Sequence, residues 1–235
     1  MGIKIPVKEK WQSLFAKKSG IEIGGPSPMF KNTGHLPIYP VIQSLDGVNF
    51  STSTVWEGEL SEGNFYKYQD KAGHQYIAEG TYLPQVADSK YDFVLSCNNL
   101  EHIANPIAAV SEWKRIIKKG GVILLVLPNK LANFDHDRPY TTINHLVNDF
   151  NSNVGEEDNT HMEEILKLHD LKRDPQAGTY EMFTKRCSEN FINRCMHHHV
   201  FNQHLLREIF EYCGMEVKLQ YSSKTDHFIA AIRKT

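Results

Sequence analysis

A glycine turn after the first expected strand is the feature of this sequence best suited to let a small molecule approach the backbone. The apolar run 20–23 is followed by GGPSP at 24–28. Glycine lacks the Cβ that would keep a ligand away from the main chain, and N–H groups at a following helix N-terminus favour an anionic group. We therefore expect Gly24, Gly25 and Ser27 to contact a carboxylate or a phosphate of a ligand.

Each of the first three expected strands also carries an acid near its carboxyl end. Glu22 lies in the first strand, Asp46 follows the second and Glu79 follows the third. A carboxylate can accept hydrogen bonds from both hydroxyls of a ribose, or from an amine. Acids around one crevice disfavour a polyphosphate and suit a ligand with an ammonium or sulfonium charge. The alternative interpretation is that these acids only cap the loops that follow the strands.

Residues 91–128 predict a strand, a polar turn, a helix, a glycine turn and a buried strand in direct succession. Ser96, Asn98 and Asn99 follow the apolar residues 93–95 of the first of these strands. Ligands of open α/β sheets bind in the crevice outside the carboxyl ends of the strands. These three polar side chains are therefore expected where a small molecule would be held.

The elements that must position these residues form one α/β domain over residues 1–235. Apolar runs and alternation predict a seven-stranded mixed sheet whose last two strands form an antiparallel hairpin. The strands are expected at 20–23, 39–42, 75–78, 91–96, 122–127, 216–221 and 227–232, and helices at 8–18, 106–118 and 203–212. Residues 129–200 break the strand–helix alternation, so we expect an insertion there that covers the crevice.

The composition argues against a nucleic-acid substrate and against a membrane-spanning protein. The 235 residues contain 26 Lys and Arg against 28 Asp and Glu, for a net charge of −2. This balance provides no large basic field to hold a phosphate backbone. The four cysteines form no CxxC pair, and the start has no apolar run of signal-peptide or membrane-spanning length. We expect a reduced, cytoplasmic setting and no transmembrane segment.

Taken together, these motifs resemble the class I S-adenosylmethionine-dependent methyltransferases, of the methyltransferase type 11-like kind. The resemblance rests on EIGGPS at 22–27, LEHIANP at 100–106, KKGG at 118–121 and the terminal hairpin. It implies a Rossmann-like fold with S-adenosyl-L-methionine as the cofactor. The turn departs from the family pattern, because the usual third glycine is missing and Pro26 and Pro28 stiffen it. A nicotinamide-dependent dehydrogenase, the nearest alternative, requires a G-x-G-x-x-G turn that this chain does not supply.

The resemblance also implies which residues hold the cofactor, from its methionine end to its adenine. Glu22, Gly24, Gly25 and Ser27 would shape the methionine end, Asp46 would hold the ribose, Glu79 the adenine amine, and Ser96 and Asn98 the amino-acid moiety.

The expected reaction is methyl transfer to a hydroxyl of a small molecule or of a sugar or glycan. A hydroxyl must lose a proton, and His titrates near neutral pH, so His136 and His199 are predicted as general bases. His102 is expected to organise the turn in which it lies. Three residues are predicted to contact the acceptor: Arg138 and His198 of the insertion at 129–200, and Asn99. The alternative function is a noncatalytic partner subunit that binds the cofactor without turnover.

The insertion also contains acids and histidines that are suitable metal ligands. They are Glu156, Glu157, Asp158, His161, Glu164 and His169. Their spacing matches no defined metal motif, and an acidic run of this kind is usually a solvated helix start. The sequence therefore predicts no metal site.

Overall fold

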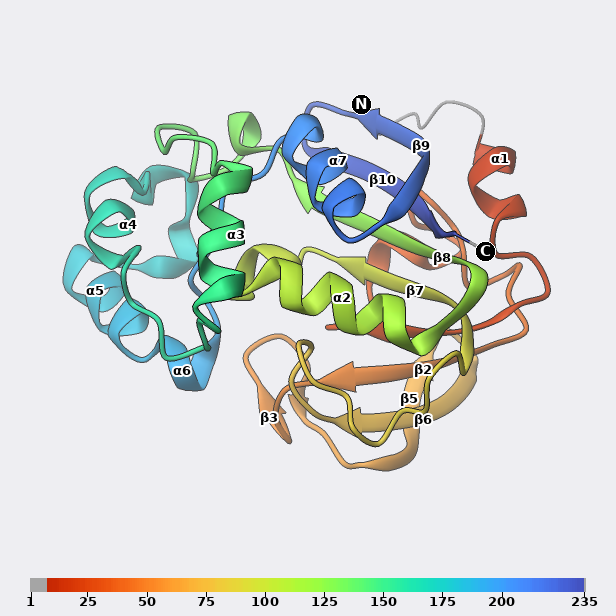
Figure 1. The fold of residues 1–235 in the computed structure, drawn as a ribbon. Coiled ribbons are helices and arrows are strands. Elements are labelled where there is room, and N and C mark those ends of the chain that lie inside the picture. Colours follow the sequence, from red (N-terminus) through yellow and green to blue (C-terminus); the bar gives the residue numbers. More distant parts are fainter. Residues whose placement is uncertain (1–7, 235) are drawn as a thin grey trace.

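Eight strands form the central mixed sheet of the computed structural model, which describes residues 8–234 (Figure 1). Their order across the sheet is β5-β6-β2-β1-β7-β8-β10-β9. The strands are β1 (Ser19–Ile23), β2 (Ser44–Asn49), β5 (Gly63–Tyr68), β6 (Lys71–Ile77), β7 (Tyr91–Cys97), β8 (Ile117–Pro128), β9 (Met215–Ser222) and β10 (Asp226–Arg233). A separate two-stranded ribbon pairs β3 (Ser53–Thr54) with β4 (Gly58–Glu59).

The order of the parallel strands creates a ligand-binding crevice at one edge of the sheet. β1 pairs in parallel with β2 on one side and with β7 on the other, while β2 pairs with β6 and β7 with β8. The chain thus moves outward from β1 through β2 and β6, and then returns to continue from β7. Such a reversal of strand order is where open α/β sheets bind ligands. The crevice therefore lies at the carboxyl ends of β1 and β7.

The central strands form because both of their faces are apolar. Phe93 and Leu95 in β7 contribute to the core on one face of the sheet, and Val94 between them contributes to the core on the other face. All three side chains have no exposed surface. This alternation places a hydrophobic layer on each side of the sheet, and each layer needs a cover.

Helices cover the face of the sheet to which Val94 contributes (Figure 1). They are α2 (Pro106–Ile116), α3 (Ile143–Asn151) and α7 (Gln203–Tyr212). Helix α2 begins at Pro106 because Asn105 caps it, with its side chain accepting a hydrogen bond from the Ala108 N–H at 3.1 Å. Among residues 8–234, no helix combines the length and the apolar character needed to cross a lipid bilayer.

The opposite face is covered by α1 (Lys8–Ser13) and by a loop that contains the 3-10 helix η1 (Pro28–Phe30). Phe15 contacts Phe93 of the sheet edge-to-face, with ring centroids 5.3 Å apart. Between β1 and β2 the chain contains η1 and otherwise irregular segments, and aromatic side chains close this face of the core.

Residues 129–200 form a separate group of helices beside the carboxyl ends of the parallel strands (Figure 1). Besides α3, these are α4 (Met162–Leu168), α5 (Tyr180–Ser188) and α6 (Asn190–Asn193), with 3-10 helices η3 (Lys130–Ala132), η4 (Leu171–Arg173) and η5 (Pro175–Ala177). The group has its own small core, which includes Ile165, Phe183 and Cys187.

The structure confirms the α/β class, the terminal hairpin and the final helix at 203–212, and it corrects three predicted elements. Residues 39–42 are not a strand, because Pro40 has no N–H to donate to a ladder and the chain turns there; β2 begins only at residue 44. The sheet has eight strands instead of seven, because β5 pairs antiparallel with β6. The first helix ends at residue 13 because the chain must turn, with Lys17 at φ +59°, to enter β1.

Candidate active site

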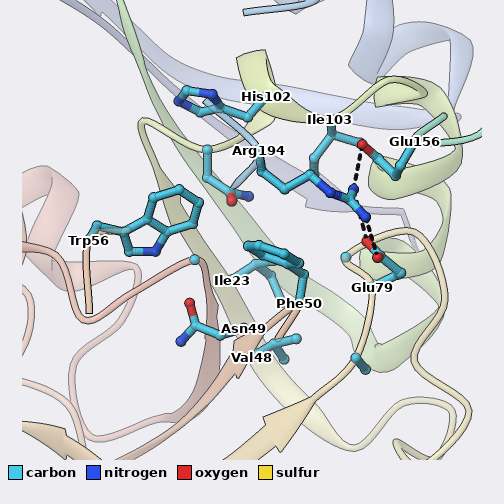
Figure 2. A pocket seen from close by; sticks show the side chains of 14 residues that line it. Ile23, Val48, Asn49, Phe50, Trp56, Glu79, His102, Ile103, Glu156 and Arg194 are labelled. Atoms are coloured by element: carbon cyan, nitrogen blue, oxygen red, sulfur yellow. Dashed lines mark hydrogen bonds and ion pairs between the residues drawn. The ribbon is translucent and has the colours of Figure 1, made fainter. Parts of the chain in front are cut away.

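Two adjoining hollows open at the carboxyl ends of the parallel strands. The first, of about 30 Å³, lies between β1, β2, β6 and the 3-10 helix η2 (Leu100–His102) (Figure 2). The second, of about 230 Å³, lies over the glycine turn and the end of β7. They share Gly24, Trp56, Asn99 and His102 in their linings, so they form one continuous site.

The glycine turn forms the floor that the two hollows share. Gly24 has φ +79°, and its N–H donates to the Val48 carbonyl at 2.9 Å. A Cβ at this position would lie only 2.4 Å from Oδ1 of Asn99. Only glycine fits both the backbone conformation and the neighbouring side chain. The predicted role of Gly24 is thus consistent with its position in the site.

Glu22 supports this turn from below and lines neither hollow. Its side chain is fully buried and accepts hydrogen bonds from Tyr39 Oη at 2.6 Å, Tyr66 Oη at 2.7 Å and the Ser27 N–H at 3.0 Å. Burial raises the pKa of this carboxyl to about 7, against the lowering effect of the three donors. Glu22 therefore holds Ser27 in the lining of the second hollow instead of contacting a ligand itself.

Asn49, at the carboxyl end of β2, lies in the first hollow, where the sequence predicted Asp46. Its Nδ2 donates to the Gly25 carbonyl at 3.0 Å, and its Oδ1 is buried without a hydrogen-bond partner among residues 8–234. Asp46 lies three residues earlier and accepts from Tyr91 Oη at 2.5 Å and from the His74 N–H at 2.9 Å. The sequence missed Asn49 because the expected strand ended too early.

Glu79 lies in the first hollow, as predicted, and a cation from the insertion holds it there. Arg194 makes ion pairs with Glu79 and with Glu156, each at 2.7 Å (Figure 2). The guanidinium carbon also lies 4.9 Å from the centroid of the Phe50 ring. These contacts explain why the first hollow is so narrow. The sequence did not predict Arg194 as a site residue, because its partners Glu79 and Glu156 are distant from it in the chain.

The end of β7 supplies polar groups to the second hollow. Asn98, at φ +47°, and Asn99 line it together with Ser27. Ser96 is buried behind them and its Oγ accepts from Asn99 Nδ2 at 3.3 Å. Asn98 and Asn99 therefore face the site as expected, while Ser96 positions Asn99.

His102 is the imidazole at the junction of the two hollows. Its Nδ1 lies 3.1 Å from the Met196 carbonyl. A carbonyl can only accept, so Nδ1 carries the proton of the neutral ring and Nε2 keeps its lone pair. Burial, and next the nearby His197, hold the pKa of His102 well below its usual value. Trp56 stacks on the ring, with centroids 6.2 Å apart.

The four predicted site residues that lie in the insertion, His136, Arg138, His198 and His199, are outside both hollows. His136 Nε2 lies 2.9 Å from an oxygen of Asp170, and the buried His199 has its Nε2 3.0 Å from the Ala104 carbonyl. His198 is buried with its Nε2 3.1 Å from Asn190 Nδ2.

Arg138 is almost completely buried and serves the insertion itself. Its guanidinium pairs with Asp135 at 2.9 Å and with Glu164 at 2.8 Å. It also donates to the carbonyls of His197 at 2.8 Å and His198 at 3.1 Å. With its donors occupied in this way, Arg138 does not offer the acceptor contact that the sequence predicted.

Comparison with known proteins supports the same class of fold. A family model described as a methyltransferase domain matches residues 44–125. No curated protein matches the chain by sequence. An S-adenosylmethionine-dependent methyltransferase from Mesorhizobium loti shares 9% identity with a TM-score of 0.55, covering 97% of this chain and 96% of its own. A chain of the complex between the Haloferax volcanii Trm112 methyltransferase activator and a protein assigned as a methyltransferase shares 12% identity with a TM-score of 0.52, covering 97% and 90%. The sheet order and these matches confirm the predicted methyltransferase fold.

Proposed function

We propose that this chain, a class I S-adenosylmethionine-dependent methyltransferase by its fold and its methyltransferase-domain match, methylates a hydroxyl of a small polar acceptor such as a sugar. The observation that carries the choice of acceptor is a neutral imidazole, His102, at the junction of the first and second hollows. The lining of the second hollow includes Ser27, Asn98 and Asn99, whose side chains can bind hydroxyls.

The first hollow and the glycine turn are suited to the cofactor. The unpartnered Oδ1 of Asn49 can accept from a ribose hydroxyl, and Glu79 can accept from the adenine amine. Phe50 offers an aromatic face for the adenine ring. Ser27 and Asn98 would then hold the amino-acid end on the floor of the second hollow.

Cofactor entry requires a rearrangement around Arg194. A space of about 30 Å³ accommodates water and not a nucleoside. The guanidinium of Arg194 bridges Glu79 and Glu156 across this space (Figure 2). We propose that it moves aside as the adenosine binds, which would free Glu79 for the adenine amine.

The reaction itself needs mainly positioning and one proton acceptor. S-adenosylmethionine, when bound, would supply a methyl carbon activated by its sulfonium, and the site would hold the acceptor oxygen in line with that carbon. The hydroxyl proton passes to Nε2 of His102, and the resulting imidazolium releases it to solvent. His102 replaces His136 and His199 in this proposal, because both of those lie outside the hollows.

The acceptor class follows from the walls of the second hollow. Trp56 is 41% exposed there and offers a flat apolar surface, while Ser27, Asn98 and Asn99 offer hydrogen bonds. A sugar presents one apolar ring face and a rim of hydroxyls, and it fits this combination better than a lipid or a polyanion. A cytoplasmic location and the absence of a nucleic-acid substrate remain parts of the proposal, supported by four unpaired cysteines and the balanced charge.

The insertion at 129–200 lies beside the cofactor in the proposed site, whereas the sequence predicted that it covers the acceptor. It contributes Glu156 and Arg194 to the first hollow, and no residue to the lining of the second. We propose that it closes over the cofactor, while Trp56 and Glu57 form the acceptor wall.

The proposal is tested by methyl transfer to a panel of nucleotide-sugars, free sugars and small amines or thiols, with products identified by mass spectrometry. Methylation of a hydroxyl that is lost in His102→Gln and kept in His136→Ala supports it. Transfer to an amine or thiol refutes the acceptor class. Binding of S-adenosylhomocysteine without turnover on any acceptor favours a noncatalytic partner subunit.

A further inference from the structure

Three histidines from separate segments of the insertion converge, and the carboxylate of Asp149 lies beside two of them. His145 and Asp149 lie one turn apart on α3, His161 directly precedes α4, and His199 precedes α7. Nε2 of His145 is 2.8 Å from Nε2 of His161 and 3.3 Å from Oδ2 of Asp149. One nitrogen of each histidine lies within 4.8 Å of the others. We refer to these four residues as the histidine cluster.

The histidine cluster contains buried polar atoms that make no hydrogen bond. Oδ2 of Asp149 and Nδ1 of His199 make no hydrogen bond within the described chain. His199 is only 1% exposed, so bulk solvent does not reach its free nitrogen. Leaving such atoms unsatisfied costs about 1 to 3 kcal/mol each. A shared cation would satisfy the carboxylate and the ring nitrogens together.

We propose that the histidine cluster binds a Zn²⁺ ion. Zinc prefers four ligands of this kind in a tetrahedron, and bonds of about 2.0 to 2.2 Å place neighbouring ligand atoms about 3.3 Å apart. The contacts of 2.8 and 3.3 Å that His145 makes with His161 and Asp149 lie close to that spacing. His145 is 42% exposed, so the ion can enter from solvent along this side chain.

The surroundings have the hydrogen bonds that orient metal ligands. Nδ1 of His161 lies 3.1 Å from Asp158, which also accepts from the Thr160 hydroxyl at 2.9 Å. Nε2 of His199 lies 3.0 Å from the Ala104 carbonyl and 4.0 Å from Oδ2 of Asp149, and Nδ1 is the nitrogen of this ring that makes no hydrogen bond within the described chain. Metal-bound imidazoles commonly donate their second N–H to a carboxylate or a carbonyl.

Two neighbouring groups of His and acidic residues are less suitable. Asp158, His161 and His198 lie close together, but the carboxylate of Asp158 already accepts from Thr160. Glu101, His102 and His197 also converge, but there Nδ1 of His197 lies 2.6 Å from Asp135, and His102 is bonded to a carbonyl. Each of these two groups has one buried atom without a hydrogen bond, Oε2 of Glu101 and Nδ1 of His198, whereas the histidine cluster has two, Oδ2 of Asp149 and Nδ1 of His199.

With four protein ligands the ion would be structural, since a catalytic zinc keeps an open position. It would fasten α3, the start of α4 and the segment before α7 to the loop at Ala104. The adjacent Asn105 already donates to the Asp149 carbonyl at 3.2 Å. Ile103, in the same loop, lines the first hollow. The inference does not depend on the proposed methyl transfer.

The test is the zinc content of the purified full-length chain. After stripping with a chelator and dialysis against Zn²⁺, wild type should retain about one ion per chain, as expected for a closed structural site. Asp149→Asn and His145→Ala should each weaken Zn²⁺ binding by at least about tenfold. Co²⁺ substituted for Zn²⁺ should show the strong visible absorption of tetrahedral coordination in wild type and not in these variants.

The matched control is His204→Ala on α7. His204 also faces an acid one turn later, with Nε2 3.6 Å from Oε1 of Glu208, but it is exposed and stands apart from the histidine cluster. This variant should bind Zn²⁺ as wild type does. Binding of no Zn²⁺ by wild type, or equal loss in His204→Ala and Asp149→Asn, would overturn the proposal and leave an adventitious ion only. If Asp149→Asn does not fold, the partly exposed His145 still provides a test.

Discussion

Gly24→Ala should weaken cofactor binding through a local clash in the glycine turn. A non-glycine residue at φ +79° costs about 1 to 2 kcal/mol. The added Cβ would also lie 2.4 Å from Oδ1 of Asn99, which forces that side chain away from Ser96 and costs about 0.5 to 1.5 kcal/mol for the lost hydrogen bond. The sum is roughly 1.5 to 3.5 kcal/mol of folding stability, or a fall in Tm of roughly 3 to 14 °C.

The displaced Asn99 and the new methyl group both occupy the approach to the backbone that the cofactor needs. Affinity for S-adenosylhomocysteine, measured by calorimetry, should therefore fall by at least about tenfold, or 1.4 kcal/mol. Gly120→Ala is the matched control. Gly120 has φ +74°, but nothing lies within 4 Å of an added Cβ, and the residue is near the amino-terminal end of β8, away from the site. It should lose stability and keep its affinity. Wild-type affinity in Gly24→Ala would refute the placement of the cofactor over this turn.

Three further outcomes follow from the site. Asn49→Ala should weaken the binding of S-adenosylhomocysteine about twofold to tenfold, because one hydrogen bond is lost. Asp46→Asn should leave the affinity measured by calorimetry unchanged. The reverse result would assign the ribose contact to Asp46. His102→Gln should lower turnover by about a hundredfold or more and keep the affinity for the cofactor. Wild-type turnover should decline only at pH values well below the usual imidazole pKa, because the ring must be unprotonated to act as a base. Wild-type turnover in His102→Gln would exclude His102 as the base. Glu22 gains a folded-state pKa of about 7 from an ordinary 4.5, so its contribution to stability is present at low pH and is lost as the pH rises through 7. Between pH 4 and pH 8, chemical denaturation should show the unfolding free energy of wild type falling by about 3 kcal/mol relative to Glu22→Gln, and parallel profiles would contradict the raised pKa.

The elements of this fold could be predicted because they depend on patterns between near neighbours in the chain. Helix α7 has the predicted bounds, since an apolar stripe and the glycine at 214 define both of its ends locally. The continuous apolar runs of β7 and β8 specify strands buried on both faces, whatever surrounds them. The glycine turn at 24–25 is also a local feature.

The roles of individual side chains were decided by the tertiary structure. Where β2 ends depended on its pairing with β1 and β6, and that pairing put Asn49 at the site in place of Asp46. His136 and His199 were expected near the crevice from topology alone, but their neighbours Asp170 and Ala104 hold them elsewhere. Sequence position limits a side chain to one region of the fold, whereas its direction follows from the packing around it.

The histidine cluster shows this dependence most clearly. Its members come from residues 145 to 199, and no local spacing joins His161 or His199 to the pair on α3. The sequence determined that the insertion is rich in imidazoles and carboxylates. Only folding brings three of the histidines together beside Asp149, because contacts between distant segments arise from the packing of whole elements against one another and not from residue order.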